Sequence, residues 1–161
     1  MHSNLASEKA SGLQSDFDGA IEAFRQASEA LLKGDSKPSM ALFSRSDDVT
    51  LANPLGPPRR GPAEVDRAGA EAAAQLSDGS IVSFEEVSRY STSDLGYIVQ
   101  IERAQARLAS GGDMSPIALR ATMIFRREGD TWRIAHRHAD PIMTPRPIST
   151  VVEPQELTGS G

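Results

Sequence analysis

The 161-residue sequence contains no cysteine, few aromatic residues and no long hydrophobic run. The absence of cysteine excludes disulfides, thiolate nucleophiles and thiolate metal sites, and it is typical of a reducing compartment, so we expect a cytoplasmic location. No segment approaches the roughly 20 apolar residues that a membrane-spanning helix needs. Residues 1–14 also lack the apolar core of a secretory signal. We therefore expect no association with a membrane.

Basic residues are outnumbered by acidic ones, and the formal net charge is -5. The lysines and arginines are scattered rather than gathered into a stripe, so nucleic acid is not an expected partner. The composition, 39% hydrophobic and 24% charged, is that of an ordinary globular protein. The length suits one domain with a single core.

The first half of the sequence has the pattern of three helices. Residues 1–14 show no hydrophobic periodicity and are predicted to be disordered. Apolar residues then recur at spacings of three and four, which predicts a long amphipathic helix over about 16–33. A second, short helix is expected after Ser36, which can cap it. Gly61-Pro62 opens a third helix over an Ala-rich run that ends at Leu76.

The second half has the pattern of long β-strands separated by breaks that contain Gly, Asp and Ser. A short strand over 49–52 precedes Asn53–Pro58, where Asn, Gly and three prolines force the chain to reverse. Helices followed by an antiparallel meander predict an α+β fold, with three N-terminal helices on one face of a strongly curved, mostly antiparallel sheet that encloses a cone. The four long strands are expected at 81–90, 95–108, 117–127 and 131–140.

A single domain is expected over residues 15–142, followed by a tail over 143–161. Prolines at 141, 145, 147 and 154 exclude an ordinary helix or a central strand for the C-terminal segment. The tail therefore either runs along the surface or reaches a partner subunit.

The last predicted strand carries the strongest candidates for chemistry. In a regular strand, alternate side chains share a face. One face of this strand would then carry apolar side chains at its beginning and two imidazoles and a carboxylate at its end. We expect that end to lie at the mouth of a cavity. His138 and His136 are then candidate general acids or bases, because apolar walls and nearby charges move the pKa of an imidazole across neutrality. Asp140 would orient His138. The residues sharing this face are Trp132, Ile134, His136, His138 and Asp140.

Other interpretations of the same residues stay open. The histidines can be hydrogen-bonded strand residues without a catalytic role, and Asp140 can cap the turn before Pro141. Two imidazoles at a spacing of two can also share a metal ion, with Asp140 or Glu102 as a third ligand. Because that third ligand is not assured, we predict neither a metal site nor a cofactor.

The hairpin between the last two strands decides which residues share the histidine face. A four-residue loop at 128–131 brings an apolar stripe to that face. A three-residue loop or a bulge instead brings Arg120 and Thr122 there. We favour the four-residue loop because it pairs apolar side chains with apolar ones. It places Phe125 opposite Ile134, Met123 opposite His136 and Ala121 opposite His138.

Five further side chains are candidates for binding a ligand. Glu102 lies among apolar residues, so it either enters the cavity as an acid or pairs with a cation such as Arg103 or Arg120. Tyr97 offers a hydroxyl, although an aromatic residue in a strand is more often part of the core. The full set is Asn53, Tyr97, Glu102, Arg120 and Met123.

Three parts of the sequence resemble the NTF2-like superfamily, particularly its SnoaL-like group. They are the stretch from Ser46 to Gly56, the Arg60-Gly61 step into the third helix, and the final hairpin from Leu119 to His138. The resemblance covers roughly residues 16–142 and implies the α+β cone and a homodimer. In ketosteroid isomerase, a member of this superfamily, a general-base Asp precedes the proline of the turn. Here that position is Asn53, and an amide cannot accept and return a proton as a carboxylate does.

Two functions follow from these observations, because NTF2-like proteins include isomerases, dehydratases, hydrolases, transport factors and oligomerisation modules. The first is a module that binds a small, largely apolar molecule in the cavity or that serves to dimerise. The second is an isomerase, dehydratase or hydrolase that uses His138 and His136 as general acid and base.

Overall fold

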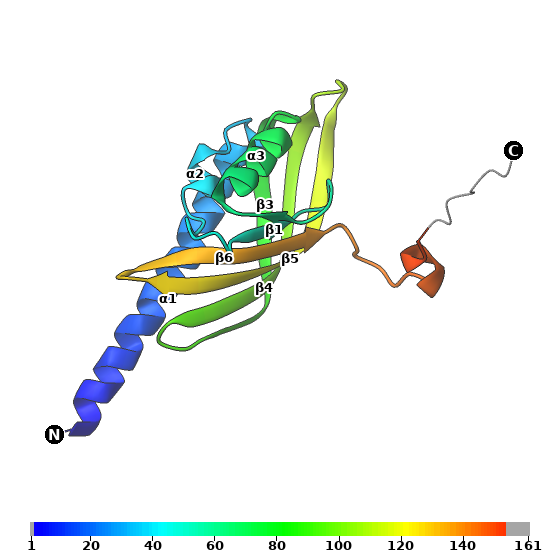
Figure 1. Cartoon of the computed structure of the whole chain (residues 1–161). Helices are drawn as coiled ribbons and strands as arrows, with labels where there is room; N and C mark the ends of the chain where they lie inside the picture. The colour runs from blue at the N-terminus through cyan, green and yellow to red at the C-terminus, as the bar shows by residue number, and fades with distance from the viewer. Residues whose placement is uncertain (1, 154–161) are drawn as a thin grey trace, which may run out of the picture.

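The computed structural model describes residues 2–153, and these form an α+β domain with a mixed sheet of six strands (Figure 1). The predicted fold class is confirmed at this level. The helices are α1 (His2–Leu32), α2 (Lys37–Met40) and α3 (Pro62–Ala73), with a 3-10 helix η1 (Ile148–Val151) after the sheet. The strands are β1 (Thr50–Ala52), β2 (Arg59–Arg60), β3 (Leu76–Ser91), β4 (Leu95–Leu108), β5 (Met114–Glu128) and β6 (Thr131–Asp140).

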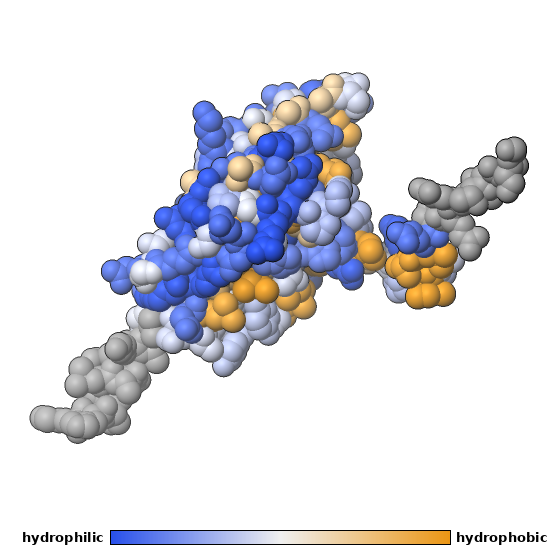
Figure 2. All heavy atoms as spheres, in the orientation of Figure 1, coloured by the Kyte–Doolittle hydropathy of each residue, from blue (hydrophilic) through white to orange (hydrophobic). Residues whose placement is uncertain are grey.

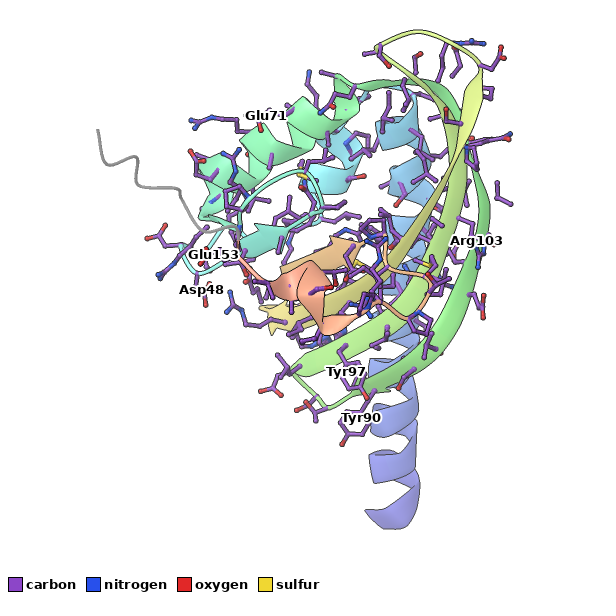
Figure 3. All side chains as sticks on the ribbon, turned by 90° about the vertical axis from the view of Figure 1, so that its right-hand side faces the viewer. Asp48, Glu71, Tyr90, Tyr97, Arg103 and Glu153 are labelled. Atoms are coloured by element: carbon purple, nitrogen blue, oxygen red, sulfur yellow. The ribbon has the colours of Figure 1, made fainter. Side chains whose placement is uncertain are left out.

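The sheet has the strand order β2-β1-β6-β5-β4-β3. Strands β3 to β6 form the predicted antiparallel meander. Strand β1 runs parallel to β6, and the predicted reversal at 53–58 returns the chain antiparallel to β1 as the short strand β2. Figure 3 shows the long strands bending around the helices. The concave face of the sheet is therefore the one that the helices cover.

Helix α1 buries the stripe that its periodicity predicts, with Phe17, Ile21, Phe24 and Leu32 all 6% exposed or less. It begins at His2, however, whereas the periodicity places its start near residue 16. Residues 2–14 contain Leu, Ala, Glu and Lys, which favour helix without forming an apolar stripe. Periodicity alone does not register that preference.

Strand β3 begins at Leu76, where the sequence predicts the end of the third helix, and five residues before the predicted strand start at Ile81; helix α3 already ends at Ala73. The Ser-Asp-Gly segment at 77–79 forms an irregularity inside the strand: the register with β4 shifts there, and Asp78 has a positive φ of 54°. A Cβ at Gly79 would lie 2.6 Å from the Cβ of Leu32. Glycine therefore lets the strand pass close beneath the end of α1.

The aromatic part of the core joins α1 to the hairpin of β5 and β6. The ring of Phe17 meets that of Phe125 edge-on, with centroids 5.5 Å apart, and lies 5.1 Å from that of Trp132. Phe43 forms a parallel bridge with Ile134, and both residues are fully buried. Trp132, which is 7% exposed, belongs to the same core cluster.

The chain leaves the sheet after Asp140 and stands clear of it (Figure 1). Between Asp140 and the end of the described residues, the secondary structure consists of the 3-10 helix η1. Ile148 and Val151 of η1 are 82% and 73% exposed, and Figure 2 shows apolar side chains gathered there. Residues 154–161 lie outside the described part, so the predicted domain and tail boundaries stay predictions. No described helix combines the length and the hydropathy that a membrane crossing requires.

Candidate functional site

A cavity of about 350 Å³ lies between the helices and the concave face of the sheet. Helices α1, α2 and α3 contribute one side of it, and the inward side chains of β4, β5 and β6 contribute the other. The walls are mainly apolar, and such walls are typical of small-molecule sites. Representative apolar lining residues are Phe24, Leu31, Met40, Leu51, Ile117 and Leu119.

One buried ion pair stands on the sheet side of this cavity. Arg137 of β6 donates two hydrogen bonds to Glu102 of β4, from Nη1 to Oε1 at 2.8 Å and from Nη2 to Oε2 at 2.7 Å. Both side chains are only 12% exposed. The guanidinium also lies over the ring of Phe24, 5.1 Å from its centroid. The cation is therefore fixed by a carboxylate at its edge and an aromatic ring at its face.

Glu102 is held in its ionised form. Burial by itself raises the pKa of the Glu102 carboxyl. The positive charge of Arg137 and the hydrogen bonds that Glu102 accepts from Arg137 and Gln100 outweigh burial, so the pKa of Glu102 is lowered. Gln100, which is fully buried, donates from Nε2 to Glu102 Oε1 at 2.9 Å and accepts from Arg25 Nη2 at 3.0 Å. A polar network thus runs from helix α1 through β4 to β6.

A β-bulge turns Arg137 into the cavity. Phe125 lies opposite Ile134 as predicted, but the next residue, Ile124, lies opposite His136, so Ala135 is an extra residue in β6. The extra residue reverses the alternation beyond it. The prediction of an apolar stripe opposite the histidines is therefore wrong. Met123 lies opposite Arg137, Ala121 opposite Ala139, Thr122 opposite His138 and Arg120 opposite Asp140.

The two histidines lie on the convex face of the sheet, away from the cavity. His136 is half-buried, and its Nδ1 lies 2.8 Å from Oγ1 of Thr50. Burial lowers the pKa of His136, and the neighbouring His138 lowers it further. His138 is exposed. Between them on β6, Arg137 points to the opposite face and lines the cavity.

Asp140 takes the structural role that the sequence left open. Its Oδ1 accepts a hydrogen bond from the backbone N–H of Ile142 at 2.9 Å, and its Oδ2 accepts one from Arg120 Nε at 2.8 Å. It therefore caps the turn after β6. Among the described residues, no three His, Cys, Asp or Glu side chains are grouped so as to hold a metal ion.

The predicted ligand-binding residues are divided between the two faces of the sheet. Asn53 and Glu102 line the cavity. Met123 is fully buried in the core beside it. Tyr97 and Arg120 lie on the convex side, where Tyr97 packs against Tyr90 with ring centroids 6.4 Å apart (Figure 3). Asn53 Oδ1 accepts from the backbone N–H of Leu55, so its carbonyl shapes the turn at the cavity rim.

Sequence reasoning missed three residues of the polar network, namely Arg137, Gln100 and Arg25. One signal for Gln100 was present: it shares the inward parity of Glu102 within a strand that is otherwise apolar on that face. Arg137 had no such signal, because a regular strand places it on the face opposite to His136.

A bent mixed sheet, three helices and an apolar cavity between them give the same fold as an NTF2-like superfamily protein from Salmonella enterica, which is 14% identical with a TM-score of 0.66. Residues 21–144 match the SnoaL-like domain, and the chain belongs to that family. A comparison with curated proteins finds no match.

Solved structures with the same fold carry different descriptions. A protein from Thiobacillus denitrificans, provisionally described as a calcium/calmodulin-dependent protein kinase type II association domain, is 28% identical, with a TM-score of 0.64 over 78% of this chain and 94% of that one. A provisional dehydratase of the NTF2-like family from Streptomyces avermitilis is 22% identical (TM-score 0.66, 81% and 97% covered). A ketosteroid isomerase-like protein from Erwinia carotovora is 16% identical (0.67, 81% and 96%). The last two similarities concern the fold alone.

Proposed function

We propose that this SnoaL-like protein binds a small, largely apolar molecule in the cavity between its helices and its sheet. The observation that carries the proposal is the combination of apolar walls with one buried ion pair, Arg137 and Glu102, on the sheet side. Apolar walls provide affinity by removing ligand surface from water, and a few fixed polar groups orient the ligand. The cavity volume of about 350 Å³ has room for roughly a dozen water-sized groups.

The alternative of catalysis by His138 and His136 lacks geometric support. A general acid or base must come within hydrogen-bond reach of the group it protonates. Both imidazoles lie on the convex face, and the cavity lies behind the sheet. A molecule in the cavity would meet Arg137 and Glu102 instead.

A thermal-shift screen with apolar molecules of about ten carbon atoms tests the proposal, because a ligand that binds only the native state raises its melting temperature. Ala72 of α3 lines the cavity, so Ala72→Phe reduces its volume. Ala70, on the same helix, is exposed, and Ala70→Phe is the matched control. We expect stabilising compounds that act on the wild type and on Ala70→Phe but not on Ala72→Phe. Absence of any stabilising compound, or equal shifts in all three proteins, would refute cavity binding.

Self-association is the second candidate function, with a second copy of this chain as the partner. The convex face of the sheet carries a row of apolar side chains that the helices of the same chain do not cover. Tyr97 in this row is 38% exposed, and the other members, which are half-buried, are Val99, Ile101 and Ile124. Such a row is more apolar than a solvated sheet face requires. The Thiobacillus denitrificans protein, 28% identical, is described as an association domain, which supports the same candidate.

Light scattering measures this association directly. We expect a dimer of the 17.2 kDa chain for the wild type. Ile101→Glu would place a charge in the centre of the apolar row, and we expect it to yield monomers. Gln105→Glu adds a charge on the exposed part of the same strand and is expected to leave the dimer intact. A monomeric wild type would refute this candidate without affecting the cavity.

A further inference from the structure

We propose that the cavity selects an electrically neutral ligand that carries a single hydroxyl or carbonyl group, which docks on the Arg137–Glu102 pair. This inference rests on the proposed function and adds the chemical class of the ligand. It follows from the charge balance of the pair, from the hydrogen-bonding capacity the pair retains, and from the engagement of three other polar side chains in the wall.

The charges of Arg137 and Glu102 cancel within the cavity wall. An anionic ligand would compete with Glu102 for the guanidinium and leave one carboxylate without a partner in apolar surroundings. A cationic ligand would compete with Arg137 for the carboxylate in the same way. Either exchange leaves a buried charge uncompensated, which is strongly unfavourable. A neutral polar group avoids both costs.

The pair keeps hydrogen-bonding capacity beyond its own two bonds. Among the described residues, Glu102 Oε1 accepts from both Arg137 and Gln100, whereas Oε2 accepts from Arg137 Nη2. A carboxylate oxygen has more than one acceptor site, and each Nη atom of a guanidinium carries two protons. Donor and acceptor thus lie side by side. A hydroxyl can use both, and a carbonyl can use the donor.

Three other polar side chains in the wall already donate hydrogen bonds within the protein. Ser28 Oγ donates to the carbonyl of Phe24 at 2.8 Å, and Ser39 Oγ donates to that of Ala27 at 3.0 Å. Gln75 Nε2 donates to the carbonyl of Glu71. A second polar group on the ligand, away from the ion pair, would therefore face carbon and lose its bonds to water. This favours a ligand with one polar group inside the cavity, since the other side chain that offers a polar group, Asn53, lies at the rim.

A matched series of probes tests the inference by calorimetry. It uses adamantane and decane skeletons, each as the hydrocarbon, the alcohol, the ketone, the carboxylate and the amine. For the wild type we expect the alcohol or ketone to bind on the order of fivefold more tightly than the hydrocarbon, as one net hydrogen bond provides. The carboxylate and the amine are expected to bind more weakly than the hydrocarbon.

Two variants separate the ion pair from the rest of the cavity. Arg137→Met/Glu102→Met removes both charges, and we expect it to abolish the preference for the alcohol while the hydrocarbon still binds. Glu102→Gln leaves Arg137 without a counter-charge, and we expect the carboxylate to become the tightest probe. In the wild type, tightest binding of a charged probe, or equal binding of the hydrocarbon and the alcohol, would overturn the inference while the proposed function stands. No binding by any probe would overturn both.

Discussion

Arg137 of β6 and Glu102 of β4 are joined by two hydrogen bonds although strand β5 lies between them. In the sheet register Arg137 lies opposite Met123 and Glu102 opposite Leu119, so the pair spans β5 diagonally. The inward residue of β5 between those two positions is Ala121, which is 2% exposed. Its small side chain leaves the space through which the long arginine reaches the carboxylate.

Removal of one partner of this pair is expected to destabilise the protein more than removal of both. Arg137→Met leaves a buried carboxylate without its cation, and we expect a loss of about 3–5 kcal/mol in the free energy of unfolding. In Arg137→Met/Glu102→Met the uncompensated charge is gone, so most of that loss should be recovered. Urea denaturation of the two single variants and the double variant measures the coupling. A double variant whose loss of stability equals the sum of the two single losses would show that the pair is not coupled.

The lowered pKa of Glu102 predicts how stability depends on acid. Its pKa in the folded protein lies below the ordinary value of 4.5, so the unfolded chain takes up the proton first. The contribution of Glu102 to the free energy of unfolding is complete above pH 4.5, and it is lost as the pH falls through the pKa of Glu102 in the folded protein. Urea denaturation at a series of pH values between 5 and 3 should therefore show that the free energy of unfolding falls more steeply for the wild type than for Glu102→Gln. Parallel curves would contradict the assignment.

His136 predicts a second, separate pH dependence. Burial and the neighbouring His138 lower its pKa below the ordinary 6.5, so the folded protein favours the neutral imidazole. The contribution of His136 to the free energy of unfolding is complete above pH 6.5. It decreases as the pH falls, because the imidazole becomes protonated in the unfolded chain first. We expect the wild type to lose stability between pH 7.5 and pH 5.5, and His136→Asn to lose less. An equal loss in both proteins would assign the effect to other groups.

Gly96 is predicted to tolerate no side chain. A Cβ there would lie 2.7 Å from Cε2 and Cζ of Phe17, whose ring is fully buried against Phe125 and Trp132. Because that ring has no room to move, Gly96→Ala should lower the free energy of unfolding by about 1–3 kcal/mol. Gly129→Ala is a poor control because Gly129 has a positive φ of 62°. Gly56→Ala meets no atom within 4 Å and is the suitable one.

The elements of this fold could be predicted because each has a local signal. Strands β4 and β6 begin and end at the predicted residues, and the turn at 53–58 reverses the chain as its prolines and Gly56 indicate. Irregular positions inside the elements had no such signal. Asp78 and Gly79 lie between the predicted third helix and the predicted strand from Ile81, and in the structure they form a local irregularity within β3.

The site depended on one such irregularity. Alanine at position 135 has no feature that distinguishes a bulge from a regular strand residue, yet the bulge decides which of His136 and Arg137 faces the cavity. Glu102 could be recognised as a candidate because a charge in an apolar strand is unusual. Its partner could not, because the pairing depends on that reversal and on the diagonal contact across β5.

The most direct test of this account compares the two faces of the sheet in one binding measurement. Calorimetric titration with adamantanol would use the wild type, His136→Asn/His138→Asn and Ala72→Phe, each checked for folding by circular dichroism. We predict that the histidine variant retains the wild-type affinity to within about twofold and that Ala72→Phe loses affinity by tenfold or more, roughly 1.4 kcal/mol. Loss of binding in the histidine variant, with binding retained in Ala72→Phe, would contradict the assignment of the cavity as the ligand site.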